Sequence, residues 1–457
     1  MEAAKETQIQ DRLHRLNERI GHSYVPPRET WTPAEEALYK PVNLLRVPVD
    51  EARVMQLKAI KYTFTRHYTL NRFYRRYCDT KGVTPDDVKT YDDLEKIPLV
   101  PDLTFKWHPS GKDFAGWIAD VYTGDLPPVT IESANPTFDD VLNAYNAAGL
   151  MVTHSTGTSG QPTVIPRDMK TARYLQYGMT KMLIDLCDPT SIDHALSLFP
   201  KPTRANLFVA KVQGPLEQFF EDHHYALDFE ISAELAIRAA VDTDDTAEQL
   251  SAEAQLRKIF TIGATWLERY DKTTDTIWML APPALFSVFL DSLEAQGKRF
   301  EFGERGFLRT AGGWKTRDGK NIPHESFRKR VEEVLGIPET HCLDIYGMSE
   351  MNSIMITCPE GHYYHPPPWL RLFVLDASLT PVGYEKFGRF AFLDPLVYSY
   401  PGFVMTGDKV RLLEHCPVCD RPGPVIDQTI SRMKSAEMRG CAVQLAKIFK
   451  RDVEEVK

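Results

Sequence analysis

The sequence has no long apolar run. No stretch approaches the ~18 consecutive apolar residues of a membrane-spanning helix, and residues 1–20 are polar, so we expect neither a membrane span nor a signal peptide. Cysteine is scarce and odd in number, with seven among 457 residues. This favours a reduced, cytoplasmic protein over a disulfide scaffold. No internal repeat is found, which argues against a solenoid or propeller.

Positive charge is also in short supply. Lys and Arg number 54 against 63 Asp and Glu, for a net charge of −9. A general nucleic-acid-binding surface is therefore not expected. The remaining composition is that of a globular protein, with 43% hydrophobic and 26% charged residues. At ~100–200 residues per domain, the length predicts two to four domains or subdomains.

Strands and helices alternate over most of the chain, and the pattern becomes β-rich after about residue 365. This order favours an α/β architecture with a smaller β-rich part. The first 50 residues are charged and interrupted by proline, so we expect an extension or lid there rather than part of the core. The expected helices are 5–20, 51–75, 139–149, 170–187, 247–270, 282–297 and 326–336, and the expected strands are 150–155, 195–200, 206–210, 307–313 and 342–347.

The most informative segment, His154–Thr163, reads HSTGTSGQPT. A strand leads into a loop of glycine and hydroxyl residues, and a helix follows. Glycines allow backbone N–H groups to converge on an anion, and the hydroxyls add further donors, so the segment suits a phosphate. It is not a Walker loop, because GxxxxGK[ST] is absent. The alternative is a flexible surface loop.

Two later segments carry complementary chemistry. The segment Asp344–Glu350, DIYGMSE, is a strand that ends in an aromatic ring, a glycine and a carboxylate. Tyr346 can stack on a base, and Glu350 can hold Mg²⁺ against phosphates. In Thr406–Asp408, TGD, which we expect to follow a strand, the carboxylate can accept both ribose hydroxyls. Each segment alone is also explained by an ordinary strand end or turn.

The order of the three segments resembles the adenylate-forming acyl synthetases, which join a carboxylate to the α-phosphate of ATP and release pyrophosphate. The resemblance covers roughly residues 154–440. It implies ATP and Mg²⁺ as cofactors, with Glu350 and Lys315 in catalytic positions. The nucleotide-binding residues that it implies are Ser155, Thr156, Gly157, Thr158, Ser159, Gly160, Tyr346, Gly347, Ser349, Asp408 and Arg432.

Further residues refine the resemblance. Thr163 follows Pro162 where many members have a lysine, and the phenylacetate–CoA ligases have threonine there. Three segments are more similar still to the LuxE-type acyl-protein synthetases: 97–106, 309–337 and 365–369. In those relatives a fatty acid is adenylated, passed to a cysteine near the C-terminus and handed to a reductase. The resemblance therefore implies an acyl-accepting protein or reductase as a partner.

The end of the sequence resembles a shortened version of the family pattern. Ser431–Gly440 is similar to the hinge before the mobile C-terminal domain, with Arg432 as the ribose contact, and 17 residues follow it. Most of the mobile domain and its lysine are therefore expected to be absent. Cys441 follows the hinge beside basic residues, which can depress a thiol pKa and favour attack on an acyl-adenylate. The alternative is a small buried residue.

A second cysteine pattern predicts a structural metal site. Cys416 and Cys419 form a CxxC knuckle, and Cys358 and His365 lie upstream of it. Three cysteines and one histidine make a closed zinc site. His362 and His415 are the other candidate histidines. A redox CxxC, without the thioredoxin βαβ context, or unrelated thiols are the alternatives.

Together these observations predict an α/β adenylate-forming fold with a helical extension (1–80), a large domain (81–430) whose β-rich subdomain spans about 365–430, and a truncated hinge segment (431–457). The predicted function is ATP-dependent activation of a carboxylic acid, fatty or other acyl, with transfer to a thiol. The alternatives are an aryl- or acyl-CoA ligase of the phenylacetate–CoA ligase type and a zinc-stabilised scaffold without catalysis.

Overall fold

The computed structural model describes residues 2–106, 108, 113–156, 161–220, 222–239, 246–314 and 321–433. Its strands are β1 (Val100–Pro101), β2 (Leu150–His154), β3 (Val164–Asp168), β4 (His194–Pro200), β5 (Asp222–Leu227), β6 (Ile277–Ala281), β7 (Gly306–Ala311), β8 (Cys342–Tyr346), β9 (Met355–Thr357), β10 (Tyr364–His365), β11 (Arg371–Leu375), β12 (Phe387–Leu393), β13 (Phe403–Leu413), β14 (Val425–Ile426) and β15 (Ser431–Arg432). Its α-helices are α1 (Glu2–Leu16), α2 (His22–Tyr24), α3 (Pro33–Tyr39), α4 (Val49–Leu70), α5 (Arg72–Lys81), α6 (Asp113–Val121), α7 (Phe138–Ala147), α8 (Met169–Leu183), α9 (Phe208–Lys211), α10 (Ala233–Ala239), α11 (Thr246–Tyr270), α12 (Pro283–Ala295) and α13 (His324–Leu335).

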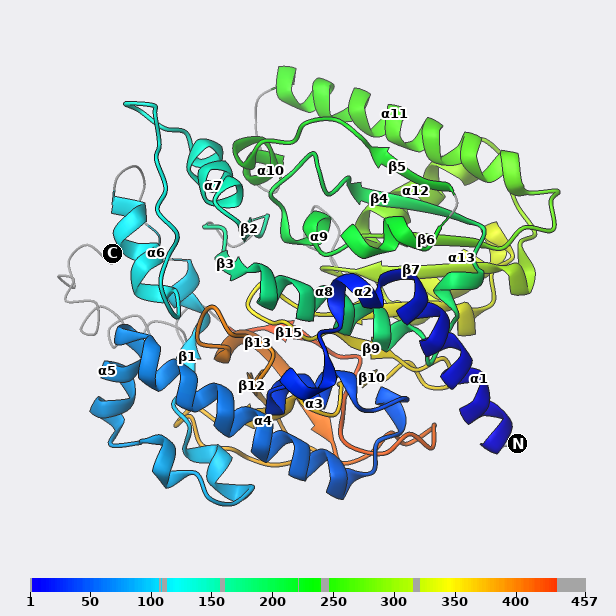
Figure 1. Cartoon of the computed structure of the whole chain (residues 1–457). Coiled ribbons are helices and arrows are strands. Elements are labelled where there is room, and N and C mark those ends of the chain that lie inside the picture. Colours follow the sequence, from blue (N-terminus) through cyan, green and yellow to red (C-terminus); the bar gives the residue numbers. More distant parts are fainter. Residues whose placement is uncertain are drawn as a thin grey trace.

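One sheet of 13 strands runs through the molecule in the order β11-β12-β13-β14-β10-β9-β8-β7-β6-β4-β5, with β1 and β15 also paired to β13 (Figure 1). Strands β5, β4, β6, β7 and β8 are parallel. The strands beyond β8 are antiparallel. Strands β2 and β3 form a separate hairpin around the glycine-rich loop. The fold is thus the mixed α/β fold with a β-rich part that the sequence predicts.

Helices cover both faces of the parallel strands. Strand β6 is buried over its whole length because its apolar residues face helices on both sides. Helices α11, α12 and α13 pack on one face, where Leu267, Phe289 and Val331 share a core with Met279 and Leu308. Helix α8 and the N-terminal helices lie on the other side, as Figure 1 shows.

Local sequence signals set several helix ends where we expected them. Helix α7 begins after Thr137, whose side chain forms a reciprocal capping box with Asp140. Helix α13 ends at Gly336, which has a φ of +67°. A Cβ at that position would come within 2.9 Å of the Glu301 Cα, so glycine is required there for two reasons.

Three expectations were wrong in detail. Residues 206–210 are not a strand, since Phe208 begins helix α9; a short apolar run does not distinguish a strand from a buried helix. Asp408 lies inside strand β13 rather than after a strand. Residues 1–50 are part of the main core: Leu16, Ile20 and Leu38 are fully buried in it.

Long-range polar contacts hold this N-terminal part in place. Lys181 on α8 donates to the carbonyls of Leu38 (2.7 Å) and Tyr39 (3.2 Å) at the end of α3. The Gln56 side chain donates to the Pro368 carbonyl at 2.9 Å. The residues in that last pair lie 312 positions apart, so the start of the described chain packs against its last third. No helix in the described residues is long and apolar enough to cross a membrane.

We expect Leu38→Ala to lower the free energy of unfolding by ~2–5 kcal/mol, because it would leave a cavity in the core. Leu38 is 0% exposed, whereas Val54 on the neighbouring helix α4 is 54% exposed. Val54→Ala is therefore the control and should change stability by less than ~0.5 kcal/mol. Chemical denaturation of both variants measures this. Equal, small effects would mean that the N-terminal segment contributes little to the core.

Candidate functional site

The hairpin of β2 and β3 closes the base of the glycine-rich loop. The Ser155 amide donates to the Thr163 carbonyl at 2.9 Å, and the Thr163 amide donates to the Ser155 side chain at 2.9 Å. The two ends of the loop are thus joined by a pair of hydrogen bonds. Thr156, the next residue along, is exposed. The loop therefore leaves and re-enters the hairpin at one fixed point.

Glu350 meets this loop at its second end. The hydroxyl of Thr163 donates to Glu350 Oε1 at 2.9 Å, across 187 positions of sequence. The Glu350 side chain is buried, and burial raises the pKa of its carboxyl, while Lys106 nearby acts in the opposite direction. The carboxylate therefore lies directly beside the predicted phosphate-binding segment. Burial disfavours the ionised form of this carboxyl, whereas a cation beside it favours that form.

A second carboxylate, that of Asp408 on β13, lies beside Tyr346 at the end of β8. The hydroxyl of Tyr346 donates to Asp408 Oδ2 at 2.8 Å, and Asp408 Oδ1 pairs with Arg432 Nη1 at 3.1 Å. Asp408 and Arg432 are direct partners in the antiparallel pairing of β13 with β15. Burial and the neighbouring Asp408 raise the pKa of Tyr346 well above its usual value, so the hydroxyl stays protonated and donates. The Tyr346 ring, the Asp408 carboxylate and the Arg432 guanidinium are therefore neighbours in the structure.

A second ion pair comes from the N-terminal part of the chain. Strand β1 pairs in parallel with β13, which brings the next residues to the same place. There Lys106 Nζ contacts Asp102 Oδ2 at 2.7 Å, with both side chains largely buried. Asp102 and Glu350 both lie within electrostatic reach of Arg432. Thr163 at the end of the glycine-rich loop, Glu350 and the Asp408–Arg432 pair therefore border a single charged region.

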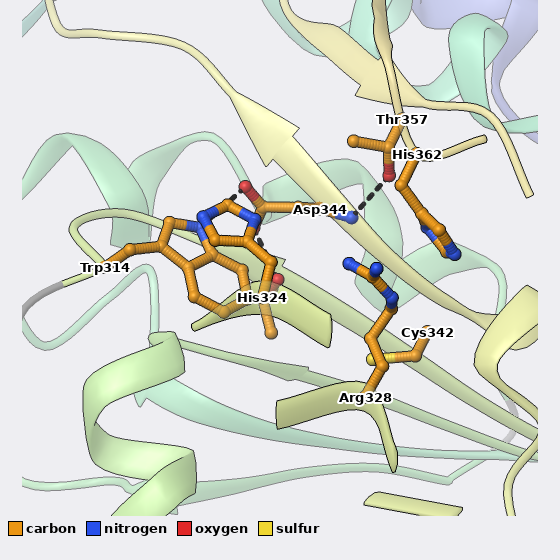
Figure 2. Close-up of a pocket in the computed structure, with 8 residues that line it drawn as sticks. Trp314, His324, Arg328, Cys342, Asp344, Thr357 and His362 are labelled. Atoms are coloured by element: carbon orange, nitrogen blue, oxygen red, sulfur yellow. Dashed lines mark hydrogen bonds between the residues drawn. The ribbon is translucent and has the colours of Figure 1, made fainter. Parts of the chain in front are cut away.

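Asp344 lies two residues before Tyr346 on β8. Its carboxylate accepts from Trp314 Nε1 at 2.9 Å and from the hydroxyls of Thr310 and Tyr364. Burial raises its pKa to about 6, and these three donors counteract that shift. Figure 2 shows Asp344 and Trp314 beside a small cavity that Arg328 also lines. The cavity measures about 10 Å³, room for about one water molecule. It is too small for a base or an acyl chain.

Three thiols and one imidazole come together at the β-rich end of the sheet. The ligand atoms of Cys358, His365, Cys416 and Cys419 all lie within 4.8 Å of one another. The Cys358 and Cys416 sulfurs are 3.9 Å apart, and the Cys419 sulfur is 3.4 Å from His365 Nε2. The antiparallel pairing of β10 with β9 and β14 brings the two halves of the group together. His362 and His415 do not belong to it.

Comparison with known proteins identifies the family of this chain. A family model described as acyl-protein synthetase, LuxE, matches residues 149–450. The chain belongs to the LuxE family of acyl-protein synthetases. It is similar to two proteins named long-chain-fatty-acid–luciferin-component ligase. The one from Vibrio harveyi is 23% identical over 88% of this chain and 90% of that protein. The one from Aliivibrio fischeri is 22% identical over 89% and 92%.

Two further comparisons bear on the wider superfamily. A segment of 50 residues is 42% identical to a phenylacetate-coenzyme A ligase from Aromatoleum evansii, covering 11% of each chain. Among solved structures, 2-hydroxyisobutyryl-CoA ligase in complex with 2-HIB-AMP and CoA is similar, with a TM-score of 0.55 and 14% identity over 90% of this chain and 73% of that one. This likeness shows the fold of the adenylate-forming ligases. Both the family and the fold inferred from the sequence are thus confirmed.

The structure places only some of the predicted site residues. It brings Ser155, Glu350, Tyr346, Asp408 and Arg432 to one region, while Gly347 and Ser349 lie in the turn between Tyr346 and Glu350. Six predicted residues lie outside the described part of the chain: Gly157, Thr158, Ser159, Gly160, Lys315 and Cys441.

Four residues of the site had no role in the sequence-based prediction: Asp102, Lys106, Thr163 and Arg167. Lys106 belongs to a segment that resembles the family, and Thr163 stands where relatives have lysine, so each carried a partial signal. Arg167 had a signal of its own, a charge directly after the apolar residues Val164, Ile165 and Pro166 of strand β3. Asp102 had none, because only the pairing of β1 with β13 places it at the site.

Proposed function

We propose that this member of the LuxE family is an AMP-forming enzyme that activates a carboxylic acid with ATP and transfers the acyl group to a thiol. The observation that carries the proposal is the hydrogen bond between Thr163 and Glu350. It joins the end of an anion-binding loop to a buried carboxylate, which is the arrangement required to hold a metal–nucleotide complex. The names of the relatives point to a long-chain fatty acid as the substrate. A cytoplasmic location is part of the proposal.

The residues would divide the work as follows. Backbone N–H groups and hydroxyls of the glycine-rich loop hold the β- and γ-phosphates. Asp408, already fixed by Arg432 and Tyr346, accepts the ribose hydroxyls, and the Tyr346 ring flanks the base. Glu350 would hold Mg²⁺, which would supply positive charge to offset the negative charge of the phosphates. Lys106 adds positive charge beside Glu350 where the sequence has threonine in place of the usual loop lysine.

The chemistry then depends mainly on position and charge. A carboxylate oxygen of the acid attacks the α-phosphorus in line, the bond from that phosphorus to the bridging oxygen breaks, and pyrophosphate leaves with its electron pair. Holding both reactants in this geometry supplies most of the rate enhancement. In the second step a thiolate attacks the acyl carbon and AMP leaves. Cys441 is the proposed thiol, and coenzyme A or a partner protein is the alternative acceptor.

Zinc is the metal that best fits the cluster of Cys358, His365, Cys416 and Cys419. A tetrahedral ion with Zn–S bonds of ~2.3 Å and a Zn–N bond of ~2.0 Å separates two sulfurs by ~3.8 Å and a sulfur from a nitrogen by ~3.5 Å. The observed separations are 3.9 Å and 3.4 Å. Four protein ligands would leave no open position, so we assign this site a structural role. It would tie the loop before β10 to the knuckle before β14.

Glu350→Gln should reduce carboxylate-dependent ATP–pyrophosphate exchange by at least ~10²-fold, because the neutral amide cannot hold the metal. Exchange is measured over a panel of fatty, aryl and amino acids. Glu332→Gln, an exposed position on α13, is the control and should retain wild-type exchange. Wild-type rates in Glu350→Gln would overturn the metal assignment. A folded wild-type protein with no exchange on any acid would favour the non-catalytic scaffold.

Cys441→Ala should retain exchange and lose the protein-bound thioester, because adenylation does not need the thiol. Labelled acid, gel separation and treatment with neutral hydroxylamine detect the thioester. Cys187→Ala is the control: it changes a cysteine outside the metal group, and this variant should retain the protein-bound thioester. A hydroxylamine-sensitive acyl-protein in Cys441→Ala would show that the acceptor is another group. CoA-dependent release of AMP would instead support the CoA ligase alternative.

The purified protein should contain about one zinc per chain, and His365→Ala should lose the metal together with several kcal/mol of stability. Metal analysis and thermal unfolding measure the two effects. His362→Ala is the matched control, since this histidine lies outside the group and should keep zinc. Equal zinc content in the two variants would refute the assignment of His365.

A further inference from the structure

A buried arginine connects the two halves of the proposed site. Arg167 lies on β3, a few residues past the glycine-rich loop, and is 0% exposed. Its Nη2 donates to the backbone carbonyls of Ser349 and, at 2.9 Å, of Met351. These two residues stand on either side of Glu350. One guanidinium nitrogen therefore donates hydrogen bonds to the backbone both before and after Glu350, the proposed metal ligand.

The remaining donors of Arg167 extend the same clamp. Nε donates to Asn352 Oδ1 at 2.8 Å, and Nη1 donates to Thr153 Oγ1 on β2 at 3.3 Å. Nη2 also reaches the Tyr400 hydroxyl at 3.1 Å, and that hydroxyl donates to the Glu350 carbonyl at 3.3 Å. Arg167 thus holds the Glu350 turn to both strands that border the glycine-rich loop.

The energetic cost of this burial argues for a specific role. A fully buried guanidinium loses its hydration and is retained only where its donors are satisfied and a counter-charge is near. Asp394, which is fully buried, and Glu350 are its acidic neighbours. The Asp394 carboxylate is itself fixed, because it accepts from the Asn352 amide at 2.8 Å and the Leu396 amide at 3.0 Å. A lysine would keep the charge but could not span these separate acceptors.

We infer that Arg167 is a positioning residue that fixes the Glu350 carboxylate against the end of the glycine-rich loop. The inference rests on the proposed function of Glu350 as a metal ligand. Thr163, which precedes β3, holds the Glu350 side chain, while Arg167 holds the backbone on either side of Glu350, at Ser349 and Met351. The end of the loop at Thr163 and the Glu350 carboxylate are therefore held together before substrate binds. Preorganisation of this kind lowers the cost of forming the complex.

Tyr400→Phe is the mildest test, because it removes the hydroxyl between Arg167 and the Glu350 carbonyl and keeps the buried ring. We expect it to raise the Mg²⁺ concentration that gives half-maximal ATP–pyrophosphate exchange by about fivefold, and Arg167→Lys to raise it at least about tenfold. The KM for the acid should stay within about twofold. The double variant should resemble Arg167→Lys alone, because both changes act on one connection.

The matched control is Tyr39→Phe on α3, which removes a hydroxyl that donates to the Tyr24 carbonyl on α2 at 2.8 Å. It should leave the Mg²⁺ dependence unchanged. Unchanged Mg²⁺ dependence in Tyr400→Phe, or an equal rise in the KM for the acid, would overturn the inference. If Arg167→Lys fails to fold, Tyr400→Phe decides alone.

Failure of the proposed function would give a different result. If the folded wild-type protein shows no exchange, the same Mg²⁺ titration is followed through the thermal shift caused by ATP. If both variants need a higher Mg²⁺ concentration than the wild-type protein to reach half of the thermal shift, the positioning role is still supported. An unchanged dependence, or a wild-type protein that ATP with Mg²⁺ does not stabilise, would overturn it.

Discussion

Strand β13 is the constraint on which the rest of the site depends. It lies in the antiparallel part of the sheet, where it pairs antiparallel with β12, β14 and β15 and also pairs in parallel with β1. Its register sets Asp408 opposite Arg432, and its pairing with β1 brings Asp102 and Lys106 to the same end. A slip of one residue in β13 would turn these side chains to opposite faces. The charged region therefore follows from one strand's hydrogen-bond pattern.

Much of the fold could be predicted because its signals are local. Helices α7, α8, α11, α12 and α13 follow caps and helical spacing, and strands β2, β4, β7 and β8 follow short buried runs. Local signals failed at Phe208, where a four-residue helix replaces the expected strand. They also failed in residues 1–50, because proline and charge describe the exposed side of this segment and hide the few apolar residues that enter the core.

The site could be predicted in part, and for a different reason. The convergence of Tyr346, Glu350 and Asp408 came from resemblance to a family, since no spacing rule places distant strands side by side. That approach gave no role to Arg167 and only a partial signal for Thr163 and Lys106. Their roles arise from hydrogen bonds and ion pairs formed only after the sheet is assembled, such as the contact from Arg167 to Tyr400 across 233 positions. A buried charge in an apolar strand indicates such a partner without identifying it.

The packing of the N-terminal segment also constrains how the chain is made. Thr32 contacts Tyr398 across 366 positions, and His67 contacts Val397 across 330. The N-terminal residues are synthesised first, but they can form these contacts only after the segment around Val397 and Tyr398 has been synthesised. During translation these residues would stay exposed at the ribosome and be candidates for chaperone binding. The high sequence separation of these contacts also predicts slow folding of the complete chain. Folding therefore waits on the C-terminal third, even though the first helices form locally.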